Sequence, residues 1–254
     1  MENIPKVVHY CWFGGNEKSE LIKSCMESWK KYLPDYEIIE WNEENFDINS
    51  NRYVQEAYKE KKWAFVSDYV RLFALYHHGG IYLDTDVEIV RELDVFLDKG
   101  CFSGFESNGS IPTGIMGAVK YNPVLEELIQ YYENRSFYLP NGKLDLTTNV
   151  QIITNICLER GFIPNGNFQL LTNGFHIYPK DYFCPKDYVS GNIHLTENSY
   201  CIHHFNGSWI NNKQKTKKTI RLFLFSILGE TIMNTVLKVK RKLLRILGLN
   251  HLNS

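Results

Sequence analysis

Short apolar runs alternate along the chain with longer segments whose apolar residues have helical spacing. Runs of β-branched and aromatic residues that end at turn residues predict strands. These runs occupy residues 6–13, 36–41, 81–90, 101–105, 114–119 and 200–205. Apolar residues at helical spacing predict helices. They cover residues 19–32, 52–61, 63–78, 123–134 and 149–160. Because strands alternate with helices, we predict an α/β fold with a mostly parallel central sheet.

The length and composition fit one globular domain followed by a tail. Of the 254 residues, 44% are hydrophobic and 22% are charged, which excludes a disordered or collagen-like chain. A polar linker at 206–217 divides the chain. We therefore predict a catalytic domain, called the body below, at 1–210 and a separate tail at 211–254.

The net charge of −1 conceals an uneven distribution of charge. The tail 211–254 contains ten Lys and Arg residues and one acid, Glu230, so the body 1–210 is acidic. An acidic body disfavours nucleic acid as a partner. In the tail, an apolar helical stripe lies opposite the basic residues. This pattern predicts an amphipathic helix on an anionic membrane surface. Packing of that stripe on the body is the alternative.

The N-terminus and the cysteines indicate the compartment. The first ten residues, MENIPKVVHY, contain no basic segment followed by an apolar one, so we expect no export signal. The six cysteines lack the spacing of a zinc site, and we expect free thiols. No segment reaches the roughly 18–20 apolar residues of a membrane-spanning helix. Together with the tail, these features predict a cytoplasmic protein that is peripheral on the inner face of the plasma membrane.

The sequence Asp84-Thr85-Asp86 follows three apolar residues of a predicted strand. Ionised carboxylates in such a strand are costly unless they are paired or bind a cation. If the chain turns there, both carboxylates converge, and oxygen ligands suit Mg²⁺ or Mn²⁺. A surface strand with solvated acids is the alternative.

Asp68 and Arg71 lie three residues apart on a predicted helix, so they share one face and can pair. Aromatic and aliphatic residues surround both of them. A polar pair in these surroundings favours a functional site over a solvated ion pair, which would contribute under about 1 kcal/mol.

Two further segments contain candidate ligands. His203-His204-Phe205-Asn206-Gly207-Ser208-Trp209 combines histidines with a glycine loop, a hydroxyl and an indole, a set that could supply a metal ligand and a lid. Cys11-Trp12 ends the first predicted strand, at the sheet edge where open α/β folds bind nucleotides. Ordinary core packing is the alternative for both segments.

Together these segments resemble the DXD-containing sugar transferases of glycosyltransferase family 32, which includes yeast mannosyltransferases and bacterial polysaccharide enzymes. The catalytic domains of the clostridial glucosylating toxins are more distantly similar. The resemblance lies in residues 7–15, 63–89 and 202–209, with a weaker match at 114–118 and 147–149. It implies a GT-A fold, a Rossmann-type nucleotide-binding architecture, for most of residues 5–210.

The resemblance also implies a role for each matching residue. Trp12 would stack on the nucleotide base with the Cys11 backbone beside it, and Asp68 and Arg71 would hold the donor sugar. Asp84 would contact ribose and sugar, and Asp86 would bind the metal directly. His204 would complete the metal site, and Ser208 and Trp209 would close over the diphosphate.

We therefore predict a retaining, metal-dependent glycosyltransferase with Mn²⁺ or Mg²⁺ as cofactor. It would move a hexosyl or N-acetylhexosaminyl group from a nucleotide-diphosphate donor, with a UDP-sugar favoured, to a saccharide or lipid-linked acceptor in capsular polysaccharide synthesis. Two alternatives remain. One is a haloacid-dehalogenase-type phosphatase, because LDTDV matches its motif locally. The other is a non-catalytic sugar-nucleotide-binding protein at the membrane surface.

Overall fold

The computed structural model describes residues 2–106 and 109–207, together with Thr216 and Thr219. The predicted tail at 211–254 lies outside the described residues apart from these two threonines, and so do Ser208 and Trp209. Contacts group the chain into two compact units, of which the larger comprises Met1–Lys186 and Ile193–Trp209. All helices and strands named below belong to this larger unit.

The elements follow the predicted alternation of strands and helices. The α-helices are α1 (Glu20–Tyr32), α2 (Arg52–Lys59), α3 (Trp63–His78), α4 (Pro123–Gln130), α5 (Asn149–Glu159) and α6 (Lys180–Phe183). The strands are β1 (Val7–Cys11), β2 (Glu37–Trp41), β3 (Gly80–Leu83), β4 (Val87–Ile89), β5 (Cys101–Gly104), β6 (Ile115–Ala118), β7 (Gln169–Leu170), β8 (Phe175–Tyr178) and β9 (Cys201–His203). Short 3₁₀ turns, η1 (Ile48–Ser50) and η2 (Asp94–Phe96), complete the described elements.

Seven strands form the central sheet in the order β2-β1-β3-β6-β5-β8-β7. Strand β1 is parallel to β2 and β3, β6 is antiparallel to both of its neighbours, and β7 is antiparallel to β8. Because β5 and β8 are parallel, five of the seven strands run in one direction. The predicted α/β class with a mostly parallel sheet is confirmed. The chain moves from β1 to β2 on one side and then to β3 on the other, and open α/β folds bind ligands at the strand ends beside such a reversal.

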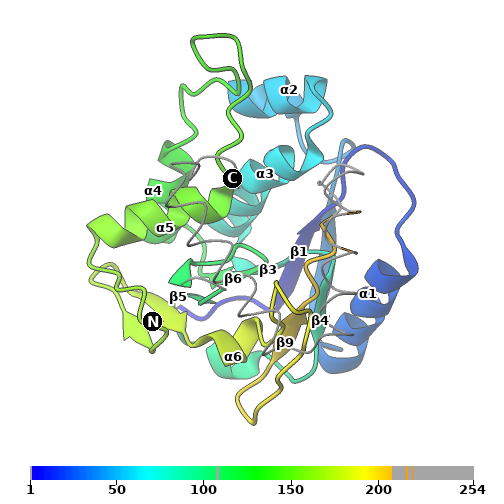
Figure 1. Cartoon of the computed structure of the whole chain (residues 1–254), viewed down its shortest axis with the longest axis vertical. Helices are drawn as coiled ribbons and strands as arrows, with labels where there is room; N and C mark the ends of the chain where they lie inside the picture. Colours follow the sequence, from blue (N-terminus) through cyan, green and yellow to red (C-terminus); the bar gives the residue numbers. More distant parts are fainter. Residues whose placement is uncertain (1, 107–108, 208–215, 217–218, 220–254) are drawn as a thin grey trace, which may run out of the picture. The chain divides into compact units, whose positions relative to one another are not determined.

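Helices cover both faces of the sheet (Figure 1). On one face, helices α2, α3, α4 and α5 form a hydrophobic core with strand side chains such as Cys11 and Tyr82. A second core joins α1, η2 and α6 with the alternate side chains, such as Tyr10 and Leu83. This division follows from the period of two in a strand, which sends neighbouring side chains to opposite faces.

Helix α1 fixes the position of the small sheet formed by β4 and β9. Ser19 caps α1 by accepting from the Ile22 N–H, and Lys30 and Lys31 lie in its last turn, where they complement the helix dipole. Trp29 on this helix is fully buried and donates its indole N–H to the Val87 carbonyl at 2.7 Å. The strand that follows the DXD motif is therefore held by a helix from much earlier in the chain.

The predicted single strand at 81–90 is wrong, because the structure contains two strands separated by a turn. Strand β3 ends at Leu83, and β4 begins at Val87 in a different sheet. The Val87 N–H donates to the Asp84 carbonyl at 2.9 Å and closes the turn. The turn places both carboxylates at the end of β3 and outside the ladder of the central sheet.

All six cysteines are buried and unpaired. No described helix is both long enough and apolar enough to cross a membrane.

Candidate active site at the DXD turn

The turn Asp84–Thr85–Asp86 lies directly after the carboxyl end of β3, beside the end of β1. The Asp84 N–H donates to the Gly114 carbonyl at 2.8 Å, which ties the turn to the segment before β6. Both carboxylates therefore lie at the edge of the sheet where the strand order reverses, which is where open α/β folds bind ligands.

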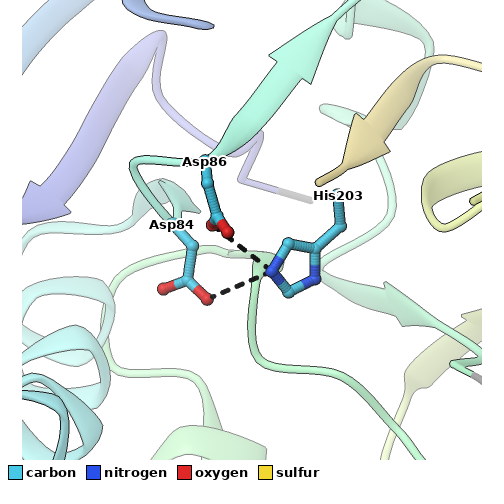
Figure 2. Close-up of side chains that lie close together, drawn as sticks. All are labelled: Asp84, Asp86 and His203. Atoms are coloured by element: carbon cyan, nitrogen blue, oxygen red, sulfur yellow. Dashed lines mark ion pairs between the residues drawn. The ribbon is translucent and has the colours of Figure 1, made fainter. Parts of the chain in front are cut away.

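Three side chains converge at this turn (Figure 2). Nε2 of His203 lies 3.4 Å from Oδ1 of Asp86 and 3.9 Å from Oδ2 of Asp84. One ligand atom from each residue lies within 4.8 Å of the other two. Their other oxygens are held by protein donors, because Tyr82 Oη–H donates to Asp84 Oδ1 and the Asn206 N–H donates to Asp86 Oδ2. Two carboxylates and an imidazole with this orientation fit one divalent cation.

The structure brings His203, and not the predicted His204, to the two aspartates. Strands β4 and β9 are antiparallel and pair Val87 with His203, so both side chains point to the same side. Val87 is fully buried, and His203 accordingly points inward to Asp84 and Asp86. The next side chain, His204, points the other way, and its Nε2 lies 2.8 Å from Oε2 of Glu88.

Gly114 makes room for the histidine. A Cβ at this position would lie 2.9 Å from Cε1 and Nδ1 of His203 and 3.3 Å from Oδ2 of Asp84. These distances are shorter than ordinary carbon contacts, so a larger residue would displace the ring. The only indication of Gly114 in the sequence was the weak match at 114–118.

The charges of Asp86 and His203 stabilise each other. Burial alone would raise the pKa of Asp86, but His203 and the Asn206 N–H lower it to about 2. Burial alone would lower the pKa of His203, but the Asp86 carboxylate raises it well above its usual value. A cation would have to displace the imidazole proton, since only neutral imidazole binds metal.

The predicted pair Asp68–Arg71 belongs to the same cluster. Arg71 Nη2 lies 3.2 Å from Asp68 Oδ1, and Nη1 lies 3.2 Å from Asp84 Oδ1. The Arg71 side chain is only 7% exposed and also donates to the carbonyl and hydroxyl of Thr113, each at 2.7 Å. This pair is a buried network that links α3 to the DXD turn, and not a solvated surface ion pair.

Burial controls the protonation of Asp68. Burial raises the pKa of this carboxyl to about 6, although Arg71 and the Asn149 N–H oppose the shift. The carboxyl group is therefore an acceptor whose charge is easily neutralised, unlike that of Asp86.

Asn149 is a site residue that the sequence reasoning did not assign. At the start of α5, its N–H donates to Asp68 Oδ2 at 3.3 Å, and its amide Nδ2 donates to the Asp68 carbonyl at 2.7 Å. Its side-chain Oδ1 is buried and has no partner within the described structure. An acceptor buried without a donor is costly. Its only signal in the sequence was the weak match at 147–149.

Cys11 and Trp12 lie at the end of β1 but point to opposite sides. Cys11 belongs to the core with α3, and burial raises its pKa to about 12, so it is an inert thiol. Trp12 packs against the core on the α1 side, donates its indole N–H to the Asn16 carbonyl at 2.8 Å and has the Lys18 ammonium 5.2 Å from its ring. The described contacts do not join Trp12 to the aspartates.

A cavity of about 560 Å³ lies beyond the end of β1, lined by residues that include Gly14, Gly15, Glu43, Tyr58 and Trp63. Trp63 begins α3 and approaches Gly14 so closely that a Cβ there would lie 2.5 Å from the indole. Since Trp63 and Arg71 share one helix and lie about 12 Å apart along it, the cavity is near the cluster.

Part of the chain is similar to a known family. Residues 19–103 match the family model described as "Glycosyltransferase sugar-binding region containing DXD motif". This segment is therefore similar to the DXD-containing region of glycosyltransferases. It includes Asp68, Arg71, Asp84 and Asp86, whereas His203 lies outside it.

Two yeasts contain similar proteins. The chain is 30% identical over 151 residues to "Inositol phosphoceramide mannosyltransferase 2" of Schizosaccharomyces pombe, covering 57% of this chain and 44% of that protein. It is 28% identical over 149 residues to "Mannosyl phosphorylinositol ceramide synthase CSH1" of Saccharomyces cerevisiae, covering 54% and 38%. The chain thus spans less than half the length of these relatives.

Solved structures of glycosyltransferases are similar at lower identity. "PaToxG Glycosyltransferase" is 21% identical with a TM-score of 0.47, covering 65% of this chain and 72% of that chain. A glycosyltransferase involved in the glycosylation of the major capsid of PBCV-1 is 10% identical with a TM-score of 0.47, covering 86% and 99%.

Proposed function

We propose that the chain is a metal-dependent glycosyltransferase that transfers a sugar from a nucleoside-diphosphate donor. The observation that carries the proposal is the convergence of Asp84, Asp86 and His203 within 4.8 Å at the end of β3, beside the buried Arg71. Within a DXD-containing region, this constellation supports donor binding better than it supports a phosphatase nucleophile.

We assign the cation to Asp84, Asp86 and His203, with Mn²⁺ or Mg²⁺ as the cofactor. When bound, such an ion neutralises the negative charge that develops on a departing diphosphate. The protein contributes the fixed orientation of its ligands. Tyr82 and Arg71 hold one oxygen of Asp84, and Asn206 holds one oxygen of Asp86.

We propose that Asp68, Arg71 and Asn149 orient the donor sugar. A protonated or ionised Asp68 can pair with sugar hydroxyls, and the partnerless Asn149 Oδ1 can accept from one. The family resemblance supports retention of configuration, with the acceptor hydroxyl attacking from the face that the diphosphate leaves. The proton of that hydroxyl then passes to a leaving phosphate oxygen, so no enzyme nucleophile is required.

For the nucleoside we propose the region around the end of β1, where Trp12 and the cavity at Trp63 lie. A uridine nucleotide remains the donor favoured by the resemblance. The names of the yeast relatives support transfer of a hexose such as mannose to a lipid-linked acceptor. The alternative acceptor is a saccharide in surface polysaccharide synthesis, and this alternative rests on the family resemblance alone.

A donor screen tests this function directly. Full-length protein with Mn²⁺ is incubated with UDP- and GDP-sugars, and release of the nucleoside diphosphate is measured with and without EDTA. We expect release from one donor class, which EDTA abolishes and added Mn²⁺ restores. Turnover of no donor, or full turnover in EDTA, contradicts the proposal.

Asp86→Asn is the matching variant, because it keeps the shape but removes a ligand charge. We expect a loss of donor turnover of at least about 100-fold, since a charge-stabilising contact in the transition state is lost. Asp98→Asn is the control, because that acid is 66% exposed and pairs with Lys99. Normal turnover by the Asp86 variant would remove the metal from the mechanism.

We also retain the proposal that the basic segment 211–254 holds the protein on the inner surface of the plasma membrane. Its support is the composition of the segment alone. Replacing Lys238, Lys240, Arg241 and Lys242 by Gln should release the protein from anionic liposomes in a sedimentation assay while donor turnover persists. Unchanged sedimentation would contradict the membrane proposal.

A further inference from the structure

The second histidine of the pair belongs to a hydrogen-bonded chain on the side of β9 opposite His203. Nε2 of His204 lies 2.8 Å from Oε2 of Glu88, and its Nδ1 lies 3.5 Å from Nζ of Lys186. An ammonium can only donate, so Nδ1 must accept and Nε2 must carry the hydrogen that Glu88 receives. The order Glu88–His204–Lys186 therefore fixes one tautomer of the imidazole.

This chain is anchored to the DXD turn through the backbone. The His204 N–H donates to the Asp86 carbonyl at 2.9 Å, which continues the pairing of β4 with β9. Asp86 lies in the turn just before β4, and its carboxylate faces His203, whereas Glu88 within β4 faces His204. Lys186 is thus linked to the DXD turn through His204, and the charge of Asp86 favours its protonated form.

The Lys186 ammonium has little to bind within the described structure. Its one hydrogen bond there is the contact with His204, so two of its three N–H groups are uncommitted. No carboxylate of the described residues lies within ion-pair distance of it, and burial lowers its pKa although Asp86 opposes the shift. A half-buried cation without a paired anion gains free energy when an anion arrives.

Arg71 is also positively charged in this cluster, but it is less able to bind an added anion. Its guanidinium is already engaged by Asp68, Asp84, Ser67 and Thr113. Asp86 in turn uses its oxygens toward His203 and the Asn206 N–H. A diphosphate that meets a cation at Asp86 would find Lys186 as the uncommitted positive charge beside it.

We propose that Lys186, positioned by His204 and Glu88, binds the diphosphate of the donor. This inference rests on the proposed glycosyltransferase function and adds a residue that no motif of the sequence indicated. Lys186 contacts the substrate, whereas His204 and Glu88 act as positioning residues.

Equilibrium binding to the full chain tests this role. Titrations use UDP and GDP, each with saturating Mn²⁺, and a separate titration uses Mn²⁺ alone. We expect Lys186→Ala to weaken binding of the preferred diphosphate about tenfold, the effect of losing one charged hydrogen bond. Lys186→Arg should recover most of this loss. Binding of Mn²⁺ alone and the melting temperature should stay at their wild-type values.

Lys30→Ala is the matched control, because that lysine is 65% exposed on α1 and pairs with Glu27. Glu88→Gln should weaken diphosphate binding less than Lys186→Ala, because it disturbs only the position of the ammonium. Wild-type diphosphate affinity in Lys186→Ala contradicts the inference while the proposed function stands. A parallel loss of Mn²⁺ affinity and melting temperature would make Lys186 structural. Wild-type protein that binds neither diphosphate would refute both proposals.

Discussion

Nη1 of Arg71 lies 3.2 Å from Oδ1 of Asp84, so the middle of α3 is tied to the turn that follows β3. The same guanidinium faces Asp68 at 3.2 Å and lies 4.7 Å from the centre of the Tyr82 ring. A single side chain thus holds two acids of the site in place and compensates their charge in a buried environment. Its loss must affect the fold as well as the chemistry.

Arg71→Ala is therefore expected to lower both stability and donor turnover. Removing one member of a buried ion pair costs about 3–5 kcal/mol, because the partner charge stays buried without compensation. From the sequence we would expect an effect on donor use alone, and the 7% exposure of the side chain changes that expectation. Urea unfolding and donor turnover measure the two effects. Unchanged stability would contradict the buried network.

The two adjacent histidines should differ in their effect on metal binding. His203→Ala removes the imidazole that faces Asp84 and Asp86, and we expect Mn²⁺ affinity to fall about 10- to 100-fold. His204→Ala leaves that imidazole in place and should keep Mn²⁺ affinity unchanged while weakening diphosphate binding. Titration with Mn²⁺ followed by electron paramagnetic resonance measures both. A larger loss in the His204 variant would reverse the assignment.

Gly114→Ala tests the space around His203 without altering any ligand. The added Cβ would lie 2.9 Å from the imidazole and 3.3 Å from Asp84 Oδ2, so both ligands must shift. We expect Mn²⁺ affinity to fall about tenfold, the lower end of effects on residues that support a metal site. Circular dichroism should show an unchanged fold. Wild-type affinity would mean that the ring moves without cost.

His9 should make the protein sensitive to acid. It is fully buried, accepts from Trp41 Nε1–H at Nδ1 and donates to the Gly79 carbonyl through Nε2. Burial lowers its pKa to about 4, so the folded state excludes a proton that the unfolded chain binds below about pH 6.5. Its contribution to stability is present above that pH and is lost as the pH falls toward 4, by about 3 kcal/mol.

Urea unfolding of wild type and His9→Gln at pH 7 and pH 4 isolates this contribution. Asp68, whose pKa near 6 makes folding more favourable as the pH falls, titrates in both proteins, and its effect cancels in the comparison. Wild type should therefore lose about 3 kcal/mol more than the variant. Equal losses would show that His9 is not the group responsible.

The sequence by itself determined the elements with strong local patterns and the acids they carry. Helix α3 has the predicted bounds of 63–78, because its apolar periodicity is long and Gly79, at φ 67°, ends it. Local spacing also singled out Asp68, Arg71, Asp84 and Asp86, since carboxylates and a guanidinium in apolar surroundings require partners. The two-residue strand β7 has too little pattern to be predicted.

Only the tertiary structure decided which side chains meet at the site. The register of β4 against β9 turns His203 toward the aspartates and His204 toward Glu88 and Lys186. Neighbouring residues of a strand point to opposite faces, so a shift of one residue would exchange the two histidines. Asn149 joins Asp68 across 81 residues of sequence through the packing of α5, which no local pattern encodes. Such contacts depend on strand pairing and helix packing between segments that are distant in the sequence. The spacing of residues within one segment does not specify them.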